Sequence, residues 1–161
     1  MKVGILMGSD SDLAVMSEAK KVLAELGVES EMRVLSAHRT PEEAGDFARN
    51  ADERGFGVII CGAGLAAHLA GAIVAQTTLP VIGVPLSAGT LGGLDSLLST
   101  VQMPPGLPVA TVAIGGAQNA ALLAAAILAL SDKALAQRLK DRRKSMREKV
   151  LAADARVQGG K

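Results

Sequence analysis

The sequence predicts an α/β fold in which helices cover both faces of a parallel β-sheet. Short apolar runs alternate along the chain with segments whose apolar residues recur at helical spacing. The first run, Val3 to Met7, is uninterrupted and stops at Gly8, which is typical of a strand that is buried on both faces. Hydrophobic residues make up 49% of the 161 residues, so we expect residues 1–161 to form a single domain with its own core.

Helix signals and stop signals place the remaining elements in order. Cap residues at 9–12 precede a helical pattern that ends at Gly27, and Pro41 begins a second helix that we expect to run to Arg54 and to end at Gly55. Further strands are expected at 28–35, 58–61, 81–84 and 108–114. Further helices are expected up to Gln76 and at 95–101, 119–130 and 132–155.

The last two predicted helices differ in character. The helix at 119–130 is apolar almost all round, so we expect it to be buried on more than one side and to form a subunit interface. The helix at 132–155 carries a sparse apolar stripe among many charges, made of Leu135, Leu139, Met146 and Val150. Such a helix either packs on its own domain or acts as an arm that docks on a neighbouring subunit.

Composition argues against several classes of function. The 17 basic residues nearly balance the 16 acidic residues, which argues against a surface for nucleic acid or for an anionic membrane. Cys61 is the only cysteine, so an intramolecular disulfide and a cysteine-rich zinc site are excluded. No apolar stretch reaches about 18 residues, and the short apolar N-terminus lacks the pattern of a signal peptide, so we expect a cytoplasmic protein without a membrane span. Without Trp or Tyr, a bound heterocycle must be held by backbone, aliphatic and charged groups.

Three turns carry the side chains that could bind a ligand or take part in catalysis. They span 8–12, 36–41 and 62–68, and each follows a predicted strand. Ligands of open parallel sheets bind beyond the carboxyl ends of the strands, so we expect a small-molecule site where these turns meet. Both histidines of the chain, His38 and His68, fall in these turns, which favours a functional role for them.

The first turn suits a phosphate or a ribose. It combines the hydroxyls of Ser9 and Ser11 with a helix N-terminus, where backbone N–H groups and the helix dipole favour anions. Asp12 would repel a phosphate but would accept hydrogen bonds from ribose hydroxyls. The alternative is that Ser11 or Asp12 only caps the helix.

The second and third turns suit a phosphate, a proton transfer and a small anion. Arg39 is suited to bidentate contact with phosphate, although it could instead pair with the acidic residues at 42–43. The imidazole of His38 is suited to general acid or base catalysis near neutral pH. The third turn offers approachable backbone at Gly62 and Gly64, which suits a carboxylate or carbon dioxide, unless these glycines serve only close packing of helix on strand.

Three other functions of such a sheet fit less well. The segment 62–67 matches a dinucleotide-binding fingerprint, but no acidic residue lies in 80–94 to hold the ribose. A flavodoxin-like module that binds a flavin or another nucleotide would lack an aromatic cover for the ring. A receiver-type signalling domain could use Asp10 and Asp12, but it needs an acceptor aspartate where Cys61 stands.

Five segments together resemble the signature of the bacterial N5-carboxyaminoimidazole ribonucleotide mutases: 8–12, 36–41, 63–69, 95–104 and 119–124. The similarity runs from Val3 to about Lys149. It implies a flavodoxin-like three-layer fold, a homo-octamer and an isomerase of de novo purine biosynthesis. The implied reaction converts N5-carboxyaminoimidazole ribonucleotide into 4-carboxy-5-aminoimidazole ribonucleotide without metal, ATP or biotin.

The resemblance also implies roles for individual residues. His38 is implied to protonate the substrate nitrogen and later to remove the proton from ring carbon 4, and Asp12 to bind the ribose hydroxyls. The phosphate is implied to be held by Ser11, Ser36 and Arg39, with Ser9 in the same pocket. The migrating carboxylate is implied to be held, as trapped carbon dioxide, by Gly62, Ala63, Gly64, Ala67, His68 and Leu69.

Two details distinguish this chain within the family. An animal-type branch makes the same product as a carboxylase that uses free carbon dioxide, but the sequence Ala66-Ala67-His68-Leu69 has the bacterial form, so the mutase is favoured and the carboxylase is the alternative. Leu65 stands where many relatives have glycine, and Ala70 where many have proline. The segment 86–93 is also divergent, and we expect these changes to alter the lid of the pocket.

Overall fold

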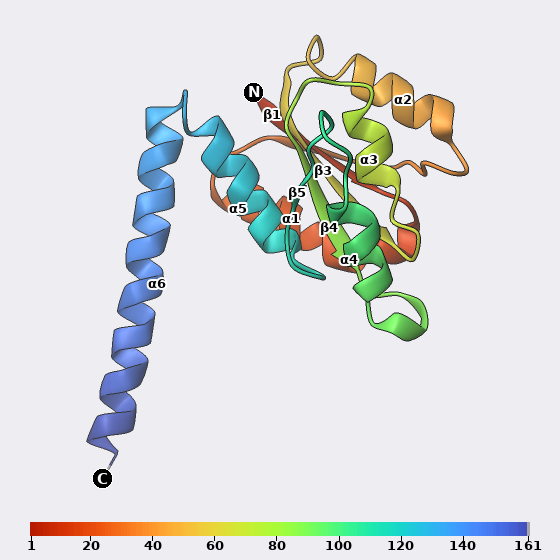
Figure 1. Cartoon of the computed structure of the whole chain (residues 1–161). Coiled ribbons are helices and arrows are strands. Elements are labelled where there is room, and N and C mark those ends of the chain that lie inside the picture. The colour runs from red at the N-terminus through yellow and green to blue at the C-terminus, as the bar shows by residue number, and fades with distance from the viewer. Residues whose placement is uncertain (161) are drawn as a thin grey trace.

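The computed structural model describes residues 1–160 and contains a five-stranded parallel sheet in the order β2-β1-β3-β4-β5 (Figure 1). The strands are β1 (Lys2–Met7), β2 (Ser30–Val34), β3 (Phe56–Gly64), β4 (Val81–Leu86) and β5 (Ala110–Thr111). The helices are α1 (Leu13–Glu25), α2 (Pro41–Arg49), α3 (Leu69–Val74), α4 (Leu94–Val101), α5 (Ala117–Leu128) and α6 (Lys133–Gly159). Two short 3-10 turns, η1 (Asp10–Asp12) and η2 (Gly89–Leu91), precede α1 and α4. The predicted α/β architecture is confirmed.

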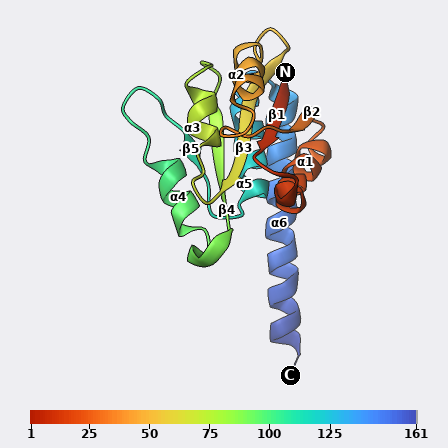
Figure 2. The same ribbon diagram turned by 90° about the vertical axis from the view of Figure 1, so that its right-hand side faces the viewer.

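Helices cover both faces of the sheet (Figure 2). The helices α1 and α5 lie on one face, and α2, α3 and α4 lie on the other. Successive side chains of β1 point to opposite faces of the sheet. Ile5 and Met7 pack in the core under α1 and α5, whereas Leu6 packs in the core under α2 and α3. Burial on both faces explains why uninterrupted apolar runs, rather than alternating patterns, identified the central strands.

Two boundaries around β3 differ from expectation. The helix α2 ends at Arg49 instead of Arg54, because residues 51–55 form turns in which Gly55 N donates to Asp52 O. The strand β3 continues to Gly64, so the glycines expected in a turn are the last residues of a strand.

The edge strand β5 is much shorter than the expected segment 108–114. Only Ala110 and Thr111 pair with β4, opposite Ile82 and Gly83. The ladder ends where Pro85 of β4 has no N–H to donate, and proline is confined to such positions in sheets.

The helix α5 packs against α1, the sheet and the start of α6. Its small residues face this core and are fully buried, namely Ala117, Ala120, Ala121, Ala124 and Ala125. Small side chains allow the close approach of α5 to α1. Leu123, on the outer side, is 37% exposed.

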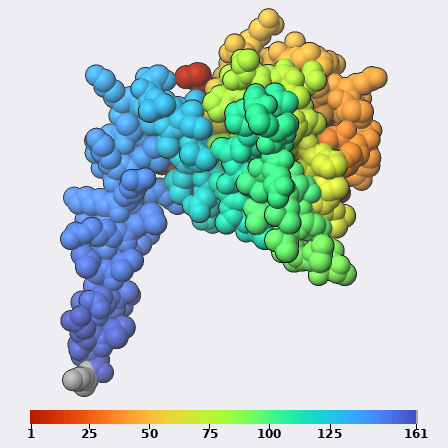
Figure 3. All heavy atoms as spheres, viewed as in Figure 1, coloured from red at the N-terminus to blue at the C-terminus, as the bar shows by residue number. Residues whose placement is uncertain are grey.

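The helix α6 begins on the domain and then leaves it as a projecting arm (Figures 1 and 3). Asp132 caps its first turn by accepting a hydrogen bond from Leu135 N at 2.9 Å, and Leu135 is the buried residue of this helix. Arg138 Nε donates to the carbonyl of Leu26 at 2.7 Å, which ties α6 to the end of α1.

Beyond these contacts the apolar side chains of the arm are exposed. Met146 is 55% exposed and Val150 is 68% exposed, although both belong to the stripe that begins with the buried Leu135. Apart from Arg142, which pairs with Glu25 of α1 at 2.6 Å, the outer part of the arm makes no ion pair with its own domain within residues 1–160, which argues against packing along the domain over its length. None of the helices within residues 1–160 combines the length and the apolar character needed to span a membrane.

Candidate active site

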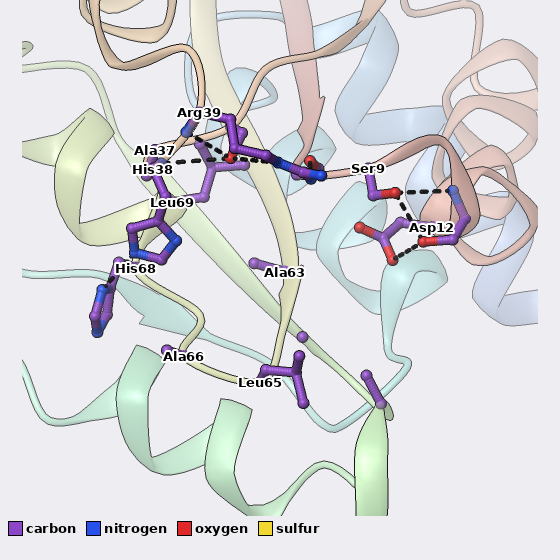
Figure 4. A pocket seen from close by; sticks show the side chains of 15 residues that line it. Ser9, Asp12, Ala37, His38, Arg39, Ala63, Leu65, Ala66, His68 and Leu69 are labelled. Carbon is purple, nitrogen blue, oxygen red and sulfur yellow. Dashed lines mark hydrogen bonds between the residues drawn. The ribbon is translucent and has the colours of Figure 1, made fainter.

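The three turns that were predicted to carry the chemistry meet at the carboxyl edge of the sheet. Met7, at the end of β1, is paired with Val34 of β2 on one side and with Gly62 of β3 on the other. The turns that follow these strands therefore lie close together, and with the loop after β4 they surround a cavity of about 450 Å³ (Figure 4). The wall combines hydroxyls, a carboxylate, a guanidinium and two imidazoles with uncharged alanine and glycine surfaces.

The first turn contributes Gly8, Ser9, Ser11 and Asp12 to the wall. Ser9 caps the turn η1, because its Oγ accepts hydrogen bonds from Ser11 N at 3.3 Å and from Ser11 Oγ at 2.9 Å, and neither Ser11 nor Asp12 caps α1 with its side chain. Asp12 precedes α1 without making a side-chain cap bond. Its carboxylate is thus available to a ligand.

Burial raises the pKa of the Asp12 carboxyl, although hydrogen bonds at Ser9 and Ser11 and the charge of Arg39 oppose this shift. A carboxylate that is partly removed from water gains more from hydrogen-bond donors on a ligand than an exposed one does. This environment is consistent with the predicted role of Asp12 as an acceptor for ribose hydroxyls.

The second turn is held in shape by two hydroxyls. Ser36 is 9% exposed, and its Oγ accepts hydrogen bonds from His38 N at 3.3 Å and from Arg39 N at 3.2 Å. Thr40 Oγ1 accepts a hydrogen bond from Ser36 N at 2.8 Å. These bonds orient both His38 and Arg39 toward the cavity.

Arg39 joins the first two turns. Its Nη2 donates to the carbonyl of Gly8 at 2.6 Å, and its Nε lies 3.5 Å from Ser36 Oγ. Within residues 1–160 it forms no salt bridge, so the alternative of an ion pair with Glu42 or Glu43 is wrong. Most of its five N–H donors remain free for an anion.

The two histidines contact each other directly. His38 Nε2 lies 2.8 Å from His68 Nδ1, and the ring centroids are 4.9 Å apart with the planes at 79°. In Figure 4 this pair lies on one side of the cavity, Ser9 and Asp12 lie on the other, and Arg39 lies between them. One ring carries the hydrogen of this bond while the other presents a lone pair, so the tautomer of one ring constrains that of the other. This contact was missed by sequence reasoning, which placed both residues at the same edge without pairing them.

The end of β3 and the following turn form the uncharged side of the cavity. Ala63, Gly64 and Leu69 line it together with His68, as predicted. Ala37, Leu65, Ala66 and Ala88 also line it but were not among the predicted site residues. Their aliphatic side chains carry no chemical signal, and only Leu65 and Ala66 fall within the family-like segment 63–69.

Two predicted residues lie outside the cavity wall. Gly62 is buried and faces α1, because a Cβ at this position would overlap Met16 Sδ and lie 2.9 Å from Met16 Cε. Its position supports the alternative that this glycine serves close packing of helix on strand. Ala67 is 1% exposed and belongs to the core beneath the turn.

Groups that could hold a metal are sparse near the cavity. Within residues 1–160 no three His, Cys, Asp or Glu side chains are grouped so that they could bind a metal ion. Cys61 is buried in β3, and burial raises the pKa of its thiol, so the reactive thiolate form is disfavoured.

The sequence is similar to that of known proteins along nearly its whole length. The sequence profile of the AIR carboxylase family matches residues 2–149. The chain is 60% identical over 146 residues to a protein of Pyrococcus abyssi, covering 91% of this chain and 84% of the relative. It is 52% identical over 157 residues to a protein of Thermotoga maritima, covering 98% and 92% of the two chains. Both relatives are named N5-carboxyaminoimidazole ribonucleotide mutase.

The fold agrees as well. The crystal structure of PurE from Treponema denticola superposes with a TM-score of 0.86 at 30% identity and covers 96% of this chain and 97% of that one. The profile match, the near full-length relatives and the shared fold lead to one conclusion. The chain belongs to the AIR carboxylase family.

Proposed function

We propose that this protein is an isomerase of de novo purine biosynthesis that converts N5-carboxyaminoimidazole ribonucleotide into 4-carboxy-5-aminoimidazole ribonucleotide. The observation that carries the proposal is the cavity itself, whose wall brings His38 together with the polar first turn and the uncharged end of β3. The names of the relatives from Pyrococcus abyssi and Thermotoga maritima support the same activity. We also keep the cytoplasmic location as part of this proposal.

The polar half of the cavity binds the ribose phosphate in this proposal. Arg39, Ser11 and Ser36 hold the phosphate, with Ser9 beside them, and Arg39 keeps its place through the carbonyl of Gly8. Asp12 accepts hydrogen bonds from the ribose hydroxyls. This arrangement directs the imidazole ring of the substrate toward the histidine pair.

His38 moves the proton. It donates a proton to the amine nitrogen of the N-carboxylate, and the N–C bond then breaks to release carbon dioxide and the neutral aminoimidazole. Ring carbon 4 attacks the carbon dioxide to form the new C–C bond. His38 then removes the proton from ring carbon 4, which restores the aromatic ring and the acid form of His38. His68 holds His38 in place through the 2.8 Å contact between the two imidazoles.

The uncharged half of the cavity retains the carbon dioxide between the two steps. Ala63, Gly64 and Leu69 present small or apolar surfaces there, beside His68. Confinement next to ring carbon 4 replaces a bimolecular reaction with an effectively unimolecular one. The proposed reaction is an isomerisation in which no metal, ATP or biotin takes part.

An assay with two different substrates distinguishes the proposed mutase from the alternative, a carboxylase. The purified protein is supplied with the N5-carboxylated nucleotide in one assay and with the uncarboxylated nucleotide and bicarbonate in another. We expect efficient turnover of the N5-carboxylated nucleotide. Efficient use of the uncarboxylated nucleotide with bicarbonate, without turnover of the N5-carboxylated one, would show that the protein is a carboxylase.

We infer in addition that the chain forms a homo-oligomer, and the family resemblance suggests an octamer. One supporting feature is α4, whose polarity is inverted. Its Ser96 and Thr100 are buried, whereas Leu94, Leu98 and Val101 are 46–52% exposed. Ser96 Oγ donates to backbone carbonyls on the inner side, so the leucines face outward. An apolar outer face of this kind marks an interaction surface.

The charge pattern and the arm support the same inference. Asp95 is the only Asp, Glu, Lys or Arg between Arg54 and Asp132, so the middle of the chain has few charges to keep its surface in water. The projecting part of α6 exposes Met146, Val150 and Val157, and an isolated helix depends on packing for most of its stability. We therefore propose two interface surfaces. One is the helix at 119–130, as the sequence predicted, and the other is α4, which sequence reasoning did not identify as a contact surface.

A further inference from the structure

Leu65 adopts a backbone conformation that leucine disfavours. Its φ is 55°, and it is the one non-glycine residue with positive φ among residues 1–160. In the left-handed region the Cβ of an ordinary residue crowds its own backbone. Such conformations persist where the surrounding structure holds them, and they concentrate at ligand sites. Leu65 follows directly after β3 and lines the cavity.

The side chain of Leu65 reaches across to the loop that follows β4. A Cβ built on Gly89 would lie 2.9 Å from Leu65 Cδ2, so the leucine rests against the backbone of η2. One residue earlier in both segments the approach is equally close, since a Cβ on Gly64 would lie 2.8 Å from the Cβ of Ala88. Leu65, Ala88 and Gly89 therefore form a continuous apolar rim.

The apolar rim lies at the uncharged end of the cavity. Figure 4 shows Leu65 and Ala66 beyond Ala63, on the side away from Arg39. Leu65 is 54% exposed, so its side chain stands between the cavity and solvent. No charged or polar side chain belongs to this rim.

We propose that Leu65 is a specificity-determining residue that closes the carboxylate end of the cavity and keeps carbon dioxide beside ring carbon 4. This inference rests on the proposed function, because only a reaction that releases carbon dioxide inside the cavity requires its retention. Carbon dioxide carries no charge, so apolar closure holds it where hydrogen bonds would not. When carbon dioxide escapes after the N–C bond breaks, the protein releases the uncarboxylated nucleotide instead of the isomer.

The test measures this partition in two variants. Leu65→Ala removes the side chain beyond Cβ but keeps a Cβ at positive φ, whereas Leu65→Gly also removes the strained conformation. The substrate carries a ¹³C label in its carboxylate, and the buffer contains unlabelled bicarbonate. The assay measures the uncarboxylated nucleotide released per isomer formed and the label retained in the isomer. Leu91→Ala is the matched control, because Leu91 is 62% exposed on the same η2 turn but does not line the cavity.

We expect both Leu65 variants to release several-fold more uncarboxylated nucleotide per isomer than the wild type, and to retain less label. Leu91→Ala is expected to keep the wild-type ratio. Because the readout is a ratio, partial misfolding of a variant lowers both products together and does not imitate the effect. The inference is overturned if neither Leu65 variant changes the ratio, or if only Leu65→Gly does, since the backbone would then matter and the side chain would not. Failure of the wild type to convert the N5-carboxylated nucleotide would instead overturn the proposed function.

Discussion

Gly62→Ala separates a packing role of Gly62 from a role in binding the carboxylate. The added methyl group would overlap Met16 Sδ and lie 2.9 Å from Met16 Cε and 3.0 Å from its Cγ, where carbon contacts are normally about 3.5–4.0 Å. Met16 is fully buried in the core under α1, so it must shift by about an ångström within a packed environment. We therefore expect a loss of stability.

The expected magnitude follows from two opposing effects. Overpacking of a core typically costs about 1–3 kcal/mol, and a flexible methionine places this case in the lower part of that range. Replacing glycine also restricts the unfolded chain, which offsets about 0.4–1 kcal/mol. The net loss is then at most about 1.5 kcal/mol, which corresponds to a fall in Tm of at most about 6 °C for a chain of this length.

The assay is thermal unfolding at one fixed protein concentration, with two comparison variants. Gly8→Ala is the control, because no atom lies within 4 Å of a Cβ at Gly8 and its Tm is expected to stay near that of the wild type. Met16→Ala leaves a cavity, and the methyl group of Gly62→Ala enters it, so the double variant is expected to be no less stable than Met16→Ala alone. A wild-type Tm for Gly62→Ala together with weaker nucleotide binding would refute the packing argument and restore the carboxylate role.

Three further predictions concern the site and the arm. His38→Asn is expected to fold and assemble normally but to lose about 10²–10⁴-fold in turnover, and retention of more than about a tenth of the wild-type rate would contradict its acid–base role. Arg39→Ala is expected to weaken binding of the nucleotide more than binding of the nucleoside without phosphate, as measured by calorimetry; equal losses would mean that Arg39 does not contact the phosphate. Removal of residues 145–161 is expected to loosen the assembly or lower its Tm, as measured by light scattering and thermal unfolding. A full-length chain that is monomeric at micromolar concentration would refute the inferred oligomer.

Sequence patterns were sufficient for the fold class and for the polar residues that line the cavity. Apolar runs identified β1, β3 and β4 because these central strands are buried on both faces, and Gly27 and Pro41 marked the end of the first helix and the start of the second. The turns at 8–12 and 36–41 were located correctly because a ligand edge in such a sheet follows the strand ends. Their hydroxyl, imidazole and guanidinium groups carry a chemical signal that can be recognised without coordinates.

Contacts between distant segments required the tertiary structure. The pairing of His38 with His68, the use of Ser9 as the cap and the placement of Gly62 against Met16 each depend on how two elements approach in space. The inverted polarity of α4 could not be predicted from its sequence either. Its hydroxyl side chains face the domain and its leucines face outward, which is the reverse of the usual arrangement. Local sequence does not encode which face of a short helix meets the sheet.

By itself, the sequence determined the fold class, the three turns of the site and the residue types available for chemistry, because these follow from local periodicity and from the strand-to-turn order. Only the tertiary structure decided which of those residues reach the cavity, where the arm leaves the domain and that Leu65 adopts a positive φ. The physical reason is that the presence and order of strands and turns follow from short-range pattern, whereas exact strand ends and side-chain contacts depend on the register between strands. That register emerges from packing of the whole core, and one residue of shift would reverse the face of every side chain.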